Sequence, residues 1–171
     1  MKLPKPKLSL RMQLFLDQAL PNKPFWDICC DHGYVGIGAI KLDFPEVHFV
    51  DQVPLIMEKI IFRFEKFPPK NNAKFKFHLN SGEDISEIVF GTCLIAGVGG
   101  LTIKNIIDNL IQGDKLKADR LLLSPHTDEK VLINCIQSNL VSDRYNLKEK
   151  IIFIEGKKER SLYVLDLKAL I

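Results

Sequence analysis

The chain has 171 residues, of which 46% are hydrophobic and 26% are charged, and its formal net charge is +3. This composition excludes an intrinsically disordered chain, and the length suits one domain. The small positive charge permits a nucleic-acid partner without indicating one, and no apolar run approaches the ~20 residues that span a bilayer. We therefore expect a soluble, cytoplasmic protein with no membrane partner.

The first helix is predicted near the N-terminus. Two prolines give residues 2–7 an extended, lysine-rich arm, and Ser9 can cap the helix that follows. Apolar residues recur there at helical spacing: Met12, Phe15, Leu16 and Ala19.

A strand, a polar loop and a helix follow in close succession. Residues 25–30 read as a buried strand, which leads through the loop with Asp31 and Gly33 into a helix over residues 34–42. A second strand, residues 47–50, ends at Asp51. A strand-end carboxylate about twenty residues after such a loop can accept hydrogen bonds from a ribose diol. The two strand ends therefore predict a nucleotide-binding site.

The remaining segments continue this alternation. Helices are expected over residues 55–67, 101–111 and 127–140, an edge strand over 74–79 and more buried strands over 92–96 and 120–123. No helix separates the last two apolar runs, residues 150–154 and 161–167, so they are expected to pair as an antiparallel hairpin.

This order predicts an α/β fold. The expected architecture is a Rossmann-like, doubly wound, seven-stranded and mostly parallel sheet with a C-terminal antiparallel β-hairpin, as in class I methyltransferases. We expect residues 1–171 to form a single domain. Within it, residues 1–23 would be the basic arm and helix, 24–145 the βα core and 146–171 the hairpin.

No metal site is expected from the sequence. The four cysteines form no CxxC pair and have no histidine spacing suited to zinc, which favours buried free thiols: Cys29, Cys30, Cys93 and Cys135. His48 and His78 fall inside predicted strands, where packing is the expected role.

Five blocks of sequence, in chain order, resemble the bacterial tRNA (adenine(22)-N1)-methyltransferase family. They are KLSLRM at residues 7–12, DICCDHGYV at 27–35, IAGVGG at 95–100, LLSPH at 122–126 and LYV at 162–164. The resemblance implies S-adenosylmethionine as cofactor, tRNA as partner and methyl transfer to N1 of an adenine.

The resemblance also implies roles for individual residues. Cofactor binding is expected of Asp27, Cys29, Gly33, Asp51, Gln52, Glu83, Asp84 and Gly97, and substrate binding of Arg11, Gly99, Gly100, Ser124, Pro125 and His126. The expected catalytic residues are Asp31, Tyr34 and His32. Asp31 would accept a hydrogen bond from the exocyclic amine of the base, Tyr34 would stack on or orient the base, and His32 would order the loop. Candidate RNA contacts form two basic clusters. The first is Lys2, Lys5, Lys7 and Arg11, and the second is Lys157, Lys158 and Arg160.

Three departures from the family leave alternatives open. Cys29 stands where the family has its first loop glycine, and Ser124 and His126 stand where it has Gln and Asn. The family's C-terminal coiled-coil domain is not among these 171 residues. A catalytically altered methyltransferase-fold protein that binds RNA or another partner is therefore one alternative. A methyltransferase of a non-RNA substrate is the other.

Overall fold

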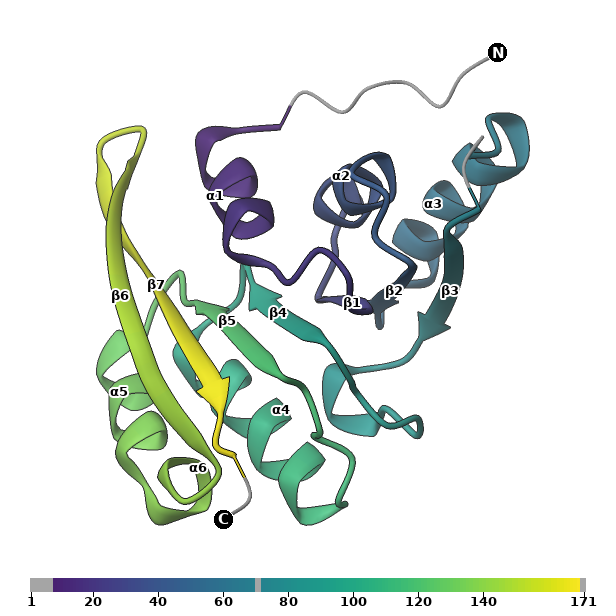
Figure 1. Ribbon diagram of the computed structural model, residues 1–171. Helices are drawn as coiled ribbons and strands as arrows, with labels where there is room; N and C mark the ends of the chain where they lie inside the picture. The colour runs from purple at the N-terminus through teal and green to yellow at the C-terminus, as the bar shows by residue number, and fades with distance from the viewer. Residues whose placement is uncertain (1–7, 70–71, 170–171) are drawn as a thin grey trace.

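The computed structural model describes residues 8–69 and 72–169, so the predicted basic arm at residues 2–7 lies outside it. One sheet holds seven strands in the order β3-β2-β1-β4-β5-β7-β6 (Figure 1). The first five strands along the chain run parallel, and β7 is antiparallel to both β5 and β6. The strands are β1 (Phe25–Ile28), β2 (Glu46–Asp51), β3 (Lys74–Leu79), β4 (Thr92–Ala96), β5 (Arg120–Ser124), β6 (Tyr145–Glu155) and β7 (Lys158–Leu167). The predicted α/β class and terminal hairpin are confirmed.

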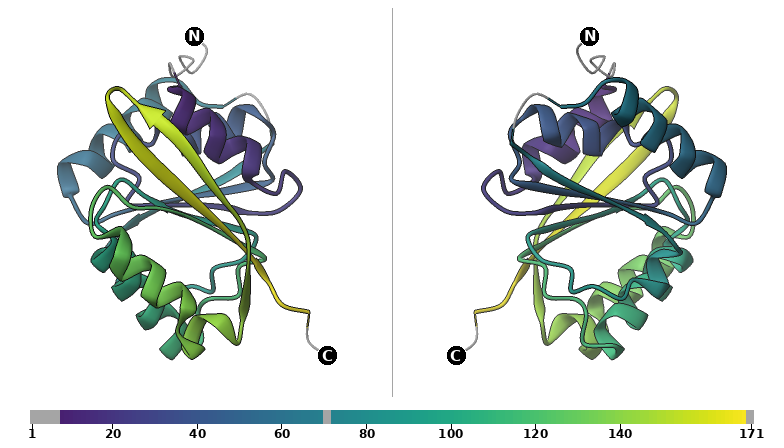
Figure 2. Two further views of the ribbon diagram at one scale, coloured as in Figure 1. Left: turned by 90° about the vertical axis from the view of Figure 1, so that its left-hand side faces the viewer. Right: turned by 90° about the vertical axis from the view of Figure 1, so that its right-hand side faces the viewer.

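Helices cover both faces of the sheet, as Figures 1 and 2 show. One face carries α1 (Leu10–Gln18), α2 (Tyr34–Lys41) and α3 (Pro54–Lys66), and the other carries α4 (Gly100–Gln112), α5 (Glu129–Gln137) and α6 (Asn139–Ser142). A buried apolar cluster lies under each layer, with Phe15 and Phe64 in the first and Ile103 and Leu132 in the second. No helix in the described part of the chain is long and apolar enough to cross a membrane.

The sheet reverses its direction of winding at β1. From β1 the chain adds β2 and β3 on one side, and it then returns to add β4 and β5 on the other. The loops after β1 and β4 consequently leave toward opposite faces, which opens a crevice at the carboxyl ends of these strands.

The predicted helix over residues 127–140 is wrong. Two helices, α5 and α6, replace it, because Ser138 between them takes an extended conformation with φ −66° and ψ 148°. The Ser138 hydroxyl donates to the carbonyl of Cys135 at 2.6 Å, a local bond that competes with helix continuation. Asp128 precedes α5 in a left-handed conformation, so Glu129 is the acidic residue in the first turn of this helix.

One strand boundary also differs from expectation. β1 stops at Ile28 instead of residue 30, because Cys29 has a φ of 61° and turns the chain out of the sheet. After β3 the chain makes a single 3-10 turn, Gly82–Asp84, before it enters β4.

The terminal hairpin extends beyond the body of the sheet. β5 pairs with β7 from Arg120↔Asp166 to Leu123↔Tyr163. From Leu162 to Lys158, β7 pairs with β6 alone among the described strands. The Arg120 guanidinium donates to both carboxylate oxygens of Asp166, at 2.6 and 2.9 Å, which ties β5 to the base of the hairpin.

We expect that Gly100→Ala destabilises the fold by roughly 1–3 kcal/mol, because a Cβ at Gly100 would lie 2.2 Å from the backbone oxygen of Asp128. Gly113→Ala, at the other end of α4, is the control. Its Cβ would lie 3.2 Å from the nearest atom, so the loss of stability should be smaller. Urea denaturation of the two variants measures the difference, and equal losses would contradict the close packing of α4 on α5.

Candidate active site

The loop between β1 and α2 has an unusual backbone. Cys29, Asp31 and Gly33 all have positive φ angles, of 61°, 48° and 67°. Residues other than glycine seldom occupy this region, and such strained positions cluster at ligand sites. Hydrogen bonds fix the loop, since the Cys30 amide donates to the Val50 carbonyl at 3.0 Å.

Asp51, at the carboxyl end of β2, is held by two backbone amides. Its Oδ2 accepts from the Asp31 amide at 3.1 Å, and its Oδ1 accepts from the Val53 amide at 3.0 Å. These bonds orient the carboxylate at the edge of the crevice, while each oxygen keeps a further lone pair for a ligand. This geometry suits a vicinal diol.

A cavity of about 380 Å³ opens beside Asp51. Its size is within the range of small-molecule sites. Of the residues predicted to bind cofactor, the cavity is lined by Cys29, Asp51, Gln52, Glu83 and Gly97, and the predicted catalytic residue Asp31 also lines it. Gly97 has a φ of 83°, and a Cβ built there would meet no atom within 4 Å. The backbone of Gly97 is therefore directly accessible from the cavity.

Asn80 is a candidate that sequence reasoning missed. It lines the cavity beside Asp51, which we call the large cavity, and its buried Oδ1 has no hydrogen-bond partner in the described structure. Its Nδ2 donates to the Asp84 carbonyl at 2.9 Å. The Asp84 carboxylate instead accepts from the Ser81 hydroxyl at 2.7 Å, and Asp84 does not line the cavity. An unsatisfied acceptor is what an amino group on a ligand would pair with. The sequence signal that could have identified Asn80 was its position directly after β3.

Asp27 is buried at the end of β1. Its Oδ2 accepts from the Gly36 amide at 2.9 Å, across the start of α2. Burial, together with the nearby Asp51 and Asp31, raises the pKa of the Asp27 carboxyl to about 7 against the lowering effect of the Gly36 bond. A buried carboxyl of this kind gains from a cationic ligand group that stabilises its charged form.

A second cavity, of about 220 Å³, adjoins the first. Cys29, Asp31 and Gly97 line both of them. Asp27 lines the second cavity only, together with Arg11 and His126 from the predicted substrate set. Burial raises the pKa of the Cys29 thiol to about 12, with Asp51 and Asp27 contributing, so the thiol at this junction is neutral at physiological pH.

A charged network forms part of the wall of the second cavity, through Arg11, His126 and Glu155. Arg11 Nη1 lies 2.5 Å from His126 Nε2 and 3.2 Å from Glu155 Oε1. Arg160 donates to the His126 carbonyl at 2.6 Å and to the Glu155 carboxylate at 3.3 Å. Burial, Arg11 and Arg160 lower the pKa of His126, so its Nε2 accepts the Arg11 bond. Glu155 at the hairpin tip was not predicted, because only the folded chain brings it beside α1.

The other predicted residues lie outside both cavities. His32 is exposed and 5.4 Å from the Tyr34 ring, over which the Arg63 guanidinium lies at 5.3 Å. Gly33 packs against Ile60, and Gly99 and Gly100 pack against the start of α5. Ser124 is buried and donates to the Ser161 carbonyl at 2.9 Å, beside the buried Pro125. Their predicted roles in binding or catalysis stay predictions.

Solved structures with this fold include tRNA methyltransferases. The M1A22 tRNA methyltransferase TrmK of Bacillus subtilis is 22% identical, with a TM-score of 0.77 over 94% of this chain and 66% of that one. TrmK of M. capricolum in complex with S-adenosyl-homocysteine is 21% identical, with a TM-score of 0.77 over 93% of this chain and 68% of that one. At these identities the likeness shows the fold. No curated protein matches the sequence.

The sequence profile of a family described as "Methyltransferase domain" matches residues 8–163. That match includes the loop after β1, the strand-end carboxylate Asp51, and every element from α1 to most of β7. This chain therefore belongs to the methyltransferase-domain family.

Proposed function

We propose that this chain is an S-adenosylmethionine-dependent methyltransferase that transfers a methyl group to N1 of an adenine in tRNA. The observation that carries the proposal is the junction of two cavities at Cys29, Asp31 and Gly97 in a methyltransferase-domain chain. Methyl transfer requires donor and acceptor sites that meet at one point. The likeness in fold to structures described as tRNA M1A22 methyltransferases supports the substrate. We treat residues 1–171 as one catalytic domain.

The large cavity is the proposed cofactor site. The two carboxylate oxygens of Asp51 would accept from the ribose hydroxyls, and the free Oδ1 of Asn80, near Glu83, would accept from the adenine amino group. Asp27, which lines only the second cavity, would pair with the ammonium group where the other end of the cofactor reaches past the junction at Cys29 and Gly97. S-adenosylmethionine, when bound, supplies a methyl group on a positively charged sulfur.

The second cavity is the proposed base site. Methylation at N1 places a positive charge on the adenine ring, and the carboxylate of Asp31 at this cavity supplies compensating negative charge. Asp31 would also accept from the exocyclic amine and so aim N1. Arg11 and His126 also line this cavity, and their contact fixes both side chains in place. They would bind the nucleotide.

Calorimetric titration with S-adenosylhomocysteine tests the cofactor site. We expect micromolar affinity, and Asp51→Ala should weaken it at least tenfold because the ribose hydroxyls lose their acceptor. Asp114→Asn, an exposed carboxylate with 73% of its side chain accessible, is the control and should bind normally. Absence of binding to the native chain would overturn the enzyme proposal. It would indicate that the Cys29 side chain closes the site and favour the catalytically altered, binding-protein alternative.

The titration of Asp27 gives a pH-dependent prediction. Its pKa in the folded chain, about 7, exceeds the ordinary 3.8, so folding favours the protonated form. This contribution to the free energy of unfolding is complete below pH 4 and is lost as pH rises through 7. The native chain should therefore lose roughly 2–3 kcal/mol of its free energy of unfolding between pH 5 and pH 8, and Asp27→Asn should remove this loss. Urea denaturation at the two pH values measures it, and parallel pH dependence in both proteins would contradict a buried, protonated Asp27.

Methylation of transcribed tRNA tests the catalytic assignment. Asp31→Ala should lower the rate of transfer about 100-fold or more, because positioning of the base is lost. His32→Ala should change it less than about threefold, since that exposed side chain lies outside both cavities. Mapping of the methylated position identifies the base. Equal effects of the two variants would contradict the role of Asp31, and transfer to proteins or metabolites instead of tRNA would replace the proposed substrate.

A further inference from the structure

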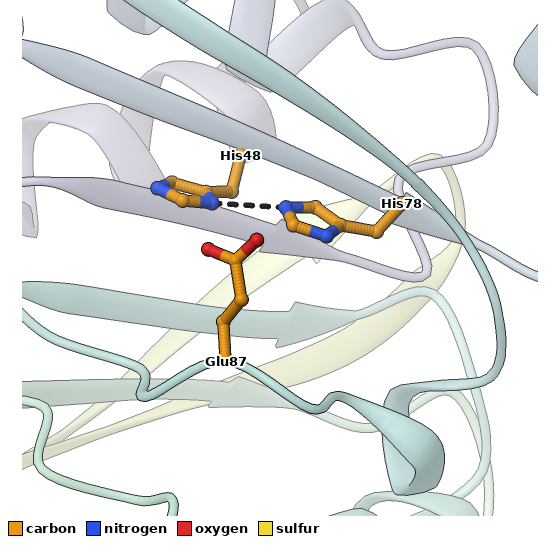
Figure 3. A group of neighbouring side chains, drawn as sticks. All are labelled: His48, His78 and Glu87. Carbon is orange, nitrogen blue, oxygen red and sulfur yellow. Dashed lines mark hydrogen bonds between the residues drawn. The ribbon is translucent and has the colours of Figure 1, made fainter.

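A second group of chemically active side chains lies away from both cavities. His48 on β2, His78 on β3 and Glu87 in the segment before β4 point toward one another (Figure 3). One nitrogen or oxygen atom from each lies within 4.8 Å of the other two. His48 Nδ1 and His78 Nε2 are 2.9 Å apart.

We propose that His48, His78 and Glu87 bind a divalent transition-metal ion, with zinc as the ion that suits them best. Two imidazole nitrogens and one carboxylate oxygen form a donor set typical of zinc. Around tetrahedral zinc, with metal–nitrogen bonds of about 2.0–2.1 Å, two nitrogen ligands lie roughly 3.3 Å apart. The imidazoles therefore need to separate by only a few tenths of an ångström to admit the ion.

The surroundings hold His48 in the form that a metal requires. His48 Nε2 lies 3.1 Å from the Glu46 carboxylate, so its proton is placed there and the Nδ1 lone pair faces the other two ligands. The Trp26 ring stacks on the His48 ring with centroids 3.7 Å apart and planes 14° apart. Only 3% of His48 is exposed, so packing fixes the orientation of the ligand before any ion arrives.

Local charge also favours a cation. Within residues 8–69 and 72–169, the carboxylates of Glu46 and Glu87 share one neighbouring ammonium, that of Lys76, at 3.6 and 3.1 Å. Lys76 contacts Glu87 Oε2, which leaves Oε1 available as a metal ligand. Two negative groups against one positive group leave a net negative site for a dication.

Metal binding would join three separate segments of the chain. β2, β3 and the segment before β4 each contribute one ligand. His78 precedes Asn80 by two residues, so the ion would anchor the loop that lines the large cavity. The inference does not depend on the proposed function.

The test uses the full chain, stripped with a chelator and freed of it, and then titrated with zinc chloride by calorimetry. We expect one equivalent to bind with micromolar or tighter affinity. His78→Gln and Glu87→Gln should each weaken binding at least tenfold. His32→Gln and Glu149→Gln, which remove exposed groups of the same types, are matched controls and should bind as the native chain does.

Cobalt(II) supplies an independent readout on the native chain. We expect ligand-field absorption at one equivalent without a sulfur-to-cobalt charge-transfer band, which excludes Cys29 as a ligand. No stoichiometric binding, a sulfur band, or undiminished affinity in folded His78→Gln and Glu87→Gln would each overturn the proposal. In those cases the histidines form a metal-free hydrogen-bonded pair.

Discussion

The candidate site depends on one carboxylate that joins two loops. Asp51 accepts hydrogen bonds from the amides of Asp31 and Val53, so the loop after β1 and the loop after β2 are held at a fixed separation. The strained backbone at Cys29 and Asp31 persists because this contact and the bond from Cys30 to Val50 stabilise it. The larger cavity lies between the two loops, and its shape follows from their attachment to neighbouring parallel strands.

Most of the fold could be predicted because its signals are local. The apolar run at 92–96 and the alternating pattern at 74–79 distinguish a central strand from an edge strand, and both became strands in those positions. The helix over 127–140 could not be divided in advance. Its apolar periodicity continues past Ser138, while the hydroxyl bond to Cys135 that accompanies the break forms only once the backbone is placed.

The site was partly predictable for the same reason. Asp51, Glu83 and Gly97 follow strand ends, which parallel strands bring to one edge of the sheet, and all three line the large cavity. Glu155 contacts Arg11 from 144 residues away. His48 and His78 meet diagonally across β2 and β3, because His48 pairs with Lys76 and His78 lies two residues further along β3. Such convergence has no signature in spacing along the chain. Tyr34 illustrates the reverse case. It belongs to a family motif, yet Arg63 lies over its ring and it lines neither cavity.

The two cavities differ in how firmly their walls are built. The loops after β1, β2 and β4, which line the large cavity, leave parallel strands inside the sheet. Glu155, which lines the second cavity, belongs to the two-stranded part of the hairpin, where β7 no longer pairs with β5. A two-stranded ribbon opens at lower free energy than a strand paired on both sides. The hairpin wall of the second cavity can therefore move at a lower free-energy cost than the large cavity, whose loops after β1, β2 and β4 leave strands that are paired on both sides.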